Sequence, residues 1–127
     1  MNMADYLEVK AGIGELRPRG ESSLVEAVDL ITEAIACCRD RRINKLLIVT
    51  TGLAGISIPT LIDRFLMVEE WARESNGIVV AALVASPEYI HPQKFGVRVA
   101  EHLGLVADVF TSESDALRWL SNYDPRG

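Results

Sequence analysis

The sequence predicts an α/β domain: a mixed sheet in which an N-terminal hairpin precedes alternating helices and strands, in the order ββαβαβαβα. Two continuous apolar runs, residues 45–51 and 78–85, are typical of strands that are covered on both faces. The segment between them has apolar residues at helical spacing, which predicts a parallel strand–helix–strand crossover. Because 127 residues suffice for one core, residues 1–127 are expected to form a single domain.

The first twenty residues predict a β-hairpin. Residues 6–11 alternate between polar and apolar side chains, which is the period of a half-exposed strand. The segment Gly12-Ile13-Gly14 favours a turn followed by a second short strand. A dinucleotide-binding loop is disfavoured, because Arg17 occupies the position of its third glycine and a strand follows the turn.

Two long helices are predicted on either side of the first apolar run. Ser23 and Glu26 have the spacing of a capping box, so a helix is expected from there to about Asp40. Its apolar stripe consists of Leu24, Val28, Ile31, Ile35 and Cys38. A second helix is expected over residues 59–74. Its expected buried stripe consists of Leu61, Phe65, Val68 and Ala72, with Ile62 and Leu66 beside it.

The last third of the chain predicts two helices around a short strand. One helix is expected to have Pro92 in its first turn and to stop at Gly104. Residues 106–110 predict a strand, and Ser112 is expected to cap a final helix. Three residues of that helix are expected to pack inward: Ala116, Trp119 and Leu120.

The charge balance argues against a nucleic-acid partner. The 13 Lys and Arg residues are outnumbered by 18 Asp and Glu residues, which gives a formal charge of −5. Such a field repels phosphate backbones. The basic cluster of Arg39, Arg41 and Arg42 falls at the expected end of a helix, where cations complement the helix dipole.

Cysteine and histidine usage predicts no metal and no cofactor. Cys37 and Cys38 are adjacent on a helix and point in different directions, so they suit neither a disulfide nor a ligand pair. His91 and His102 lack carboxylates at ligand-like spacing. Unpaired thiols, together with no apolar run of about 18 residues and no signal segment, predict a cytoplasmic protein without an integral membrane segment.

Candidate binding residues gather where the two central strands end. The loop after residue 50 follows the carboxyl end of a parallel strand, which is where open α/β sheets bind ligands. It contributes Thr51, Gly52, Ser57 and Thr60, whose backbone and hydroxyl groups suit an anion or a partner. The alternative is that Ser57 or Thr60 only caps the helix. Tyr89 follows the next strand and is expected either to shield a ligand or to be an ordinary surface residue.

Three segments resemble the SpoIIAA-like family of small bacterial proteins: KLLIVTTGL at residues 45–53, KFGVRVA at 94–100 and VFTSESDALRWL at 109–120. The resemblance implies a fold like that of the STAS domain of anti-sigma-factor antagonists and of the CRAL-TRIO lipid-binding domain. It also implies a regulatory or partner-binding role, in which a phosphorylatable serine lies at the start of the helix after the central strand. By position, Ser57 is the candidate for that serine, and Thr60 is the neighbouring hydroxyl.

The first functional hypothesis is a non-enzymatic STAS-like module that presents residues 52–60 and the following helix to a partner. The partner is another protein or a second copy of the chain. The helix has too many apolar residues for one narrow stripe, which favours a second contact face. These residues are Leu61, Ile62, Phe65, Leu66, Met67 and Val68, and Met67 marks the expected dimer surface.

Two other function classes stay open. A small-molecule or lipid binder of CRAL-TRIO type would have its pocket beside Tyr89, although a chain of this length leaves little room for a large cavity. An enzyme has the weakest support, because no nucleophilic triad and no pair of titratable groups can be assembled from the sequence.

Overall fold

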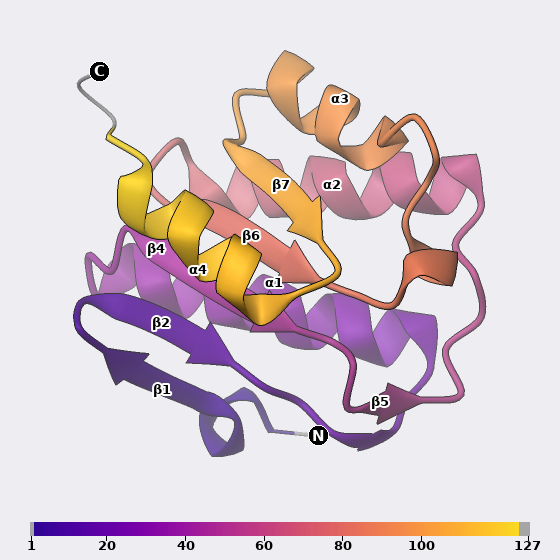
Figure 1. The fold of residues 1–127 in the computed structure, drawn as a ribbon, viewed down its shortest axis with the longest axis horizontal. Coiled ribbons are helices and arrows are strands. Elements are labelled where there is room, and N and C mark those ends of the chain that lie inside the picture. Colours follow the sequence, from indigo (N-terminus) through magenta and orange to yellow (C-terminus); the bar gives the residue numbers. More distant parts are fainter. Residues whose placement is uncertain (1, 125–127) are drawn as a thin grey trace.

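A central sheet organises the fold (Figure 1). The computed structural model describes residues 2–124, so the first residue and the last three of the expected domain lie outside this description. The described residues form a five-stranded sheet in the order β1-β2-β4-β6-β7. Its strands are β1 (Leu7–Lys10), β2 (Ile13–Leu16), β4 (Lys45–Val49), β6 (Val80–Val84) and β7 (Ala107–Phe110). β1 is antiparallel to β2 and the other pairs are parallel, which confirms a mixed sheet.

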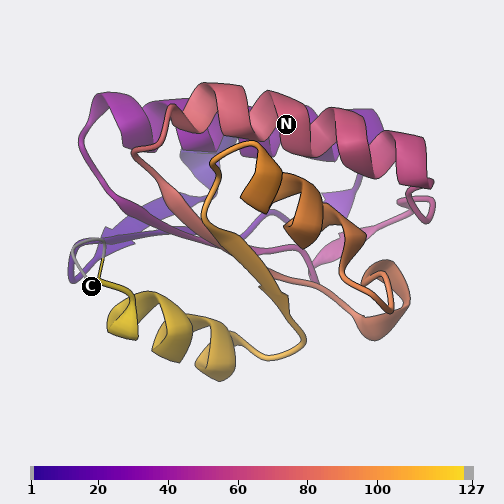
Figure 2. The ribbon, with the colours of Figure 1, turned by 90° about the horizontal axis from the view of Figure 1, so that it is seen from above.

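Helices cover both faces of this sheet. Within residues 2–124 the α-helices are α1 (Leu24–Asp40), α2 (Leu61–Ser75), α3 (Phe95–His102) and α4 (Glu113–Asn122). Figure 2 shows α1, α2 and α3 on one face and α4 on the other. Every predicted helix and strand is present in the predicted order. None of the described helices is long and apolar enough to cross a membrane.

The hairpin turns through two residues with positive φ. Ala11 has φ 51° and Gly12 has φ 80°, and they connect the paired residues Lys10 and Ile13. Positive φ at both central positions gives a turn whose twist matches that of the flanking strands. The predicted hairpin is therefore confirmed, but its turn consists of Ala11 and Gly12, so Ala11 of the strand predicted over residues 6–11 lies outside β1 and Gly14 lies within β2.

The two central strands are buried on both faces, as their apolar runs predict. Leu46 and Ile48 of β4 belong to the core beneath α1, α2 and α3. Leu47 and Val49 belong to a second core that α4 covers with Ala116 and Leu120. Alternation along β4 thus supplies both cores from one strand.

The helix α1 begins and ends as predicted. The Ser23 hydroxyl accepts a hydrogen bond from the Glu26 amide, and the Glu26 carboxylate accepts one from the Ser23 amide, each at 3.1 Å. This reciprocal pair is the expected capping box. The helix ends at Asp40, and Arg39 of the basic cluster lies in its last turn.

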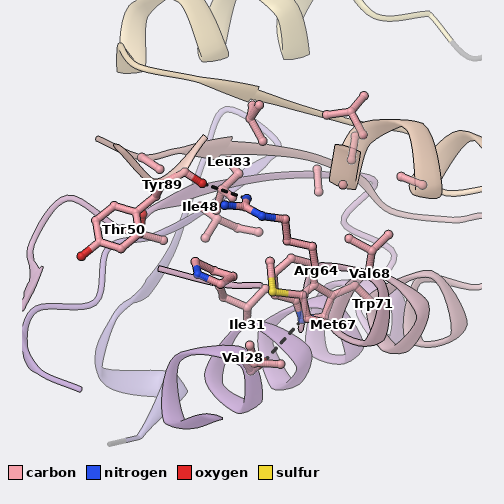
Figure 3. Close-up of a pocket in the computed structure, with 18 of the residues that line it drawn as sticks. Val28, Ile31, Ile48, Thr50, Arg64, Met67, Val68, Trp71, Leu83 and Tyr89 are labelled. Atoms are coloured by element: carbon pink, nitrogen blue, oxygen red, sulfur yellow. Dashed lines mark hydrogen bonds between the residues drawn. The ribbon is translucent and has the colours of Figure 1, made fainter. Parts of the chain in front are cut away.

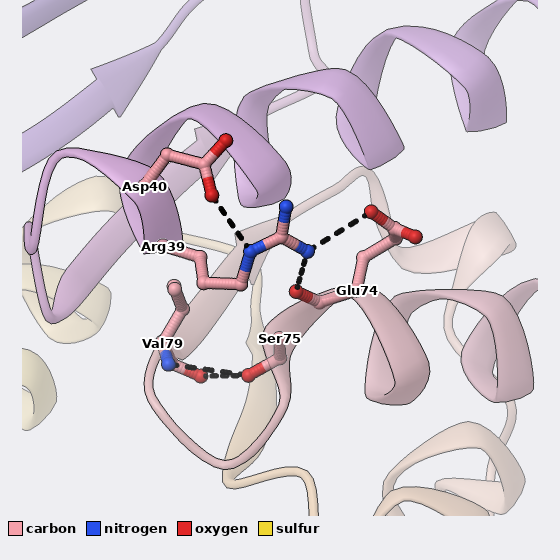
Figure 4. Close-up of polar contacts among 5 residues, drawn as sticks. All are labelled: Arg39, Asp40, Glu74, Ser75 and Val79. Carbon is pink, nitrogen blue, oxygen red and sulfur yellow. Dashed lines mark hydrogen bonds and ion pairs between the residues drawn. The ribbon is translucent and has the colours of Figure 1, made fainter.

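Arg39 ties the last turn of α1 to the last turn of α2 (Figure 4). Its guanidinium donates to the Glu74 carbonyl at 2.8 Å, to the Glu74 carboxylate at 3.1 Å and to Asp40 at 3.0 Å. The pKa of Arg39 is raised mainly by its hydrogen bond with Asp40 and, to a smaller extent, by its hydrogen bond with Glu74. Beside this pair, the Ser75 hydroxyl donates to the Val79 carbonyl and accepts from the Val79 amide, which closes the turn into β6. The two helices are therefore fixed against each other at this end.

The predicted buried stripe of α2 is partly wrong. Leu61 and Phe65 are exposed, at 52% and 41% of their surface. The indole of Trp71 explains the rotation of the helix, because it is buried against α1 and donates to the Thr32 hydroxyl at 3.1 Å. A large aromatic ring outweighs smaller side chains in deciding which face is buried. The buried residues of α2 are Arg64, Val68, Trp71 and Ser75.

Two further details differ from the sequence predictions. The helix α3 begins at Phe95 and not at Pro92, because residues 91–94 form a turn in which the Lys94 amide donates to the His91 carbonyl at 2.8 Å. Its predicted stop is confirmed, since Gly104 has φ 78°. Two unpredicted short strands, β3 (Gly20–Glu21) and β5 (Leu53–Ala54), pair in parallel beside the main sheet.

Candidate functional site

The loop after β4, which we call the contact loop (residues 52–60), is anchored at its first residue. The Gly52 carbonyl accepts a hydrogen bond from the Gly20 amide at 3.1 Å. A Cβ at Gly52 would lie 2.9 Å from the Pro18 carbonyl oxygen, so a side chain does not fit there. Gly52 therefore shapes the loop and offers no side chain to a ligand, while the neighbouring Thr51 is exposed.

The two hydroxyl residues at the end of the contact loop have different surroundings. The Thr60 hydroxyl accepts from the Asp63 amide at 3.0 Å, and the Asp63 carboxylate accepts from the Thr60 amide at 2.9 Å. The capping interpretation is thus confirmed for Thr60, which begins α2. Ser57 lies three residues earlier and is exposed. Its side chain is therefore open to solvent.

Tyr89 connects the contact loop to the segment that follows β6. Its hydroxyl donates to the Ile56 carbonyl at 2.9 Å, and its own carbonyl accepts from the Arg64 guanidinium at 2.9 Å. The predicted meeting of the two loops at one sheet edge is therefore present, with Tyr89 as the link. Tyr89 also lines a cavity next to both loops.

Exposed apolar side chains cover one side of the contact loop and of α2. We call this group the apolar patch: Ile58, Leu61, Ile62, Phe65 and Leu66. The four helical members lie on adjacent turns of α2, within reach of one another. Met67 is not among them, because it is half-buried and packs against the core. The residue expected to mark a dimer surface thus faces inward, and its exposed neighbours form the outer surface.

A cavity of about 140 Å³ lies between the sheet and the helices α1, α2 and α3 (Figure 3). It opens near the carboxyl ends of β4 and β6, beneath Tyr89 and the contact loop. Most of its walls are aliphatic or aromatic. Several wall positions have side chains no larger than a methyl group, which leaves the space unfilled: Ala81, Ala85, Gly96, Ala100 and Ala107.

Arg64 is the buried charge of this cavity. It is 9% exposed and reaches from α2 toward Tyr89 (Figure 3). Within the described residues, the hydrogen bond to the Tyr89 carbonyl is the one hydrogen bond of its guanidinium, and no carboxylate forms an ion pair with it. The nearby Lys94 differs, because Asp108 accepts from its ammonium group at 2.9 Å. Sequence reasoning missed Arg64, since a lone arginine in a helix is normally a surface residue.

The other titratable residues considered from the sequence are the two histidines and the two cysteines. The Nδ1 atom of His91 accepts from the Gln93 amide at 3.1 Å, and His102 is exposed at the end of α3. Cys38 is buried, and its pKa is raised to about 11. Burial is the larger cause, and the charge of the neighbouring Cys37 is the smaller one. The described residues contain no group of three or more His, Cys, Asp or Glu side chains arranged for a metal ion.

Similar proteins are found when structures are compared, but not when sequences are compared. No family profile and no curated protein matches the sequence. The anti-sigma factor antagonist SpoIIAA in its unphosphorylated form superimposes with a TM-score of 0.52 and 16% identity, over 92% of this chain and 97% of SpoIIAA. A candidate anti-sigma factor antagonist from Thermotoga maritima gives a TM-score of 0.51 and 13% identity, over 91% of this chain and 93% of that protein.

A third solved structure is an uncharacterised protein with a SpoIIAA-like fold from Shewanella loihica. It gives a TM-score of 0.46 and 17% identity, over 90% of each chain. The two antagonist structures cover almost the whole chain, and identities of this size establish the fold alone. This chain therefore has the mixed α/β fold of the anti-sigma factor antagonist SpoIIAA.

Proposed function

We propose that this chain is a non-enzymatic STAS-like regulatory module of the cytoplasm, which binds a protein partner through the contact loop and the apolar patch. The observation that carries the proposal is the patch itself. Ile62 and Leu66 are 72% and 55% exposed on a helix that already buries another face. Clustered apolar side chains of this kind on a small protein mark an interaction site.

The surroundings of the patch favour contact over catalysis. Three hydroxyl groups at this sheet edge serve the fold: Thr50 donates to the Val84 carbonyl at 2.8 Å, Thr60 caps α2 and Tyr89 donates to Ile56. Two of these hydrogen bonds restrain the contact loop, at Ile56 and at Thr60. A preformed loop loses less conformational entropy on binding, which increases affinity.

The charge of the chain favours a different protein over a second copy. With a formal charge of −5, two copies repel each other when they approach. Two of the solved structures with this fold are named as antagonists of an anti-sigma factor, which is itself a protein. Both considerations support a heterologous partner for the apolar patch.

Ser57 is the proposed control point of this interaction. It is exposed and directly precedes Ile58 of the apolar patch. A phosphate there would place about two negative charges beside apolar contacts, which disrupts binding through desolvation. The phosphomimetic Ser57→Glu is expected to weaken partner binding, whereas Ser57→Ala is expected to preserve it.

Affinity capture with matched variants tests the proposal. Wild-type protein, Leu66→Ser and Val25→Ser are immobilised and exposed to the same extract of the source cells. Val25 on α1 is a suitable control, because it is 69% exposed and lies outside the apolar patch. The partner is the protein that wild type and Val25→Ser retain and Leu66→Ser loses.

The captured protein is then purified and titrated. We expect Leu66→Ser to weaken its binding at least about ten-fold, as for a central interface residue, and Val25→Ser to leave the affinity unchanged. Equal retention by all three proteins would contradict the proposal. Sedimentation equilibrium tests the alternative that the partner is a second copy of the chain. If wild-type protein is a dimer and Leu66→Ser is a monomer, the apolar patch serves self-association instead.

A further inference from the structure

We propose that the cavity beneath Tyr89 binds a small apolar monocarboxylate, whose carboxylate pairs with Arg64 and whose tail occupies the apolar interior. This site is distinct from the apolar patch, because Arg64 lies on the buried face of α2 and the patch lies on the exposed face. The cavity shares only contact-loop residues with the proposed protein-binding surface, namely Leu53, Ile56 and Pro59. Either proposal can therefore fail without the other.

The charge of Arg64 is the first support. A guanidinium keeps its positive charge in proteins, and burial of such a charge is costly unless an opposite charge pairs with it. Within residues 2–124, Arg64 has the Tyr89 carbonyl as its acceptor and no carboxylate partner. A guanidinium offers five N–H donors, so most of its capacity is left for a ligand. Its planar donor pair fits a carboxylate, which accepts two parallel hydrogen bonds.

Other polar groups around the cavity already have protein partners, including the His91 ring, whose Nδ1 accepts from the Gln93 amide at 3.1 Å. The Thr50 hydroxyl donates to the Val84 carbonyl, and the Trp71 indole donates to Thr32. Lys94 is neutralised by Asp108 at 2.9 Å. Arg64 is therefore the group that selects the ligand, and it selects for one negative charge.

The size and lining of the cavity define the rest of the ligand. An engineered protein cavity of about 150 Å³ holds one benzene molecule. The cavity here, at about 140 Å³, thus has room for a tail of about six carbon atoms. Its floor and walls include Ile31, Ile48 and Leu83, which offer no hydrogen bonds to a polar tail. Hexanoate and benzoate match this description, whereas a long-chain lipid exceeds the space.

Calorimetric titration of the full chain tests the site with four probes: acetate, hexanoate, dodecanoate and hexan-1-ol. We expect hexanoate to bind with a Kd of about 1 mM or tighter. Acetate lacks the tail and hexan-1-ol lacks the charge, so each is expected to bind at least about ten-fold more weakly. The proposal is overturned if hexan-1-ol binds as tightly as hexanoate, if dodecanoate binds best, or if hexanoate shows no binding at about 10 mM.

Two variants test separately the charge of Arg64 and the volume of the cavity. Arg64→Met, checked for folding by circular dichroism, is expected to lose the preference for hexanoate over hexan-1-ol. Ala81→Val keeps Arg64 and fills part of the cavity from β6, where a β-branched residue suits the strand. It is expected to weaken hexanoate binding at least about ten-fold, and to keep the stability because the added methyl groups occupy cavity space. Wild-type affinity in Ala81→Val would overturn the proposal even if Arg64→Met does not fold.

Discussion

The hydroxyl of Tyr89 donates a 2.9 Å hydrogen bond to the backbone carbonyl of Ile56, which joins two loops whose residues are 33 positions apart in the sequence. Ile56 belongs to the contact loop, and Tyr89 follows the neighbouring strand β6. This side-chain hydrogen bond therefore ties the middle of the contact loop to the neighbouring loop, in addition to the anchors at Gly52 and Thr60.

Tyr89→Phe removes this hydrogen bond and keeps the ring. We expect the free energy of unfolding to fall by about 1 kcal/mol, the usual contribution of one such bond. We also expect faster hydrogen exchange at the amides of residues 52–60, with α1 unchanged as an internal control. Identical exchange in the contact loop of both proteins would show that the bond does not hold the loop.

Thr60→Ala removes the cap of α2. We expect urea unfolding to show a loss of about 1 kcal/mol, because the Asp63 amide loses its acceptor. Thr60→Ser keeps an oxygen there and is expected to retain most of the stability. Thr51→Ala, in the exposed turn before the loop, is the matched control and is expected to change stability by less than about 0.5 kcal/mol. Equal losses in Thr51→Ala and Thr60→Ala would contradict the capping role.

Gly14 and Cys38 form a tightly packed pair between β2 and α1. A Cβ at Gly14 would lie 3.1 Å from the Cys38 sulfur and 3.3 Å from Cδ1 of Leu46. Gly14→Ala is therefore expected to destabilise the protein by about 1–3 kcal/mol. In a Cys38→Ala background the sulfur is gone, so the same substitution is expected to cost about 1 kcal/mol less. Additive effects in this double-mutant cycle, measured by urea unfolding, would refute the crowding argument.

Cys38 also predicts a pH dependence at the alkaline end. Burial, followed by the neighbouring Cys37, raises its pKa from 9.0 to about 11 in the folded protein. The Cys38 thiol loses its proton more readily in the unfolded chain than in the folded protein. The contribution of Cys38 to the free energy of unfolding is therefore complete below pH 9.0 and is lost as the pH rises toward about 11. We expect the stability difference between wild type and Cys38→Ala to decrease over this window, measured by urea unfolding under reducing conditions. A constant difference would contradict the shifted pKa.

The backbone plan could be predicted from the sequence because its signals are local. The capping box of Ser23 and Glu26 marks the start of α1, and the apolar run of β4 marks a strand that is covered twice. The hairpin turn at Ala11 and Gly12 is likewise a short-range feature. Such patterns determine an element without reference to the rest of the chain.

The candidate sites depend on contacts that the sequence does not reveal. The buried face of α2 is set by the burial of the Trp71 indole against α1, where it donates to Thr32, 39 residues away. The same rotation turns Arg64 inward and exposes Leu61 and Phe65. The cavity results from small residues on several elements that meet only in the folded protein. One rotation of α2 therefore changes both the proposed protein surface and the proposed ligand site.

Photo-crosslinking in living cells tests the central claim, that the exposed side of α2 binds another protein. The photoreactive amino acid p-benzoylphenylalanine replaces Ile62 in one experiment and Val25 in the other, since both side chains are exposed to a similar degree. The account predicts a crosslink to one other protein from position 62 and none from position 25. Equal crosslinks from both positions, or a crosslink from position 62 only to a second copy of the chain, would contradict it.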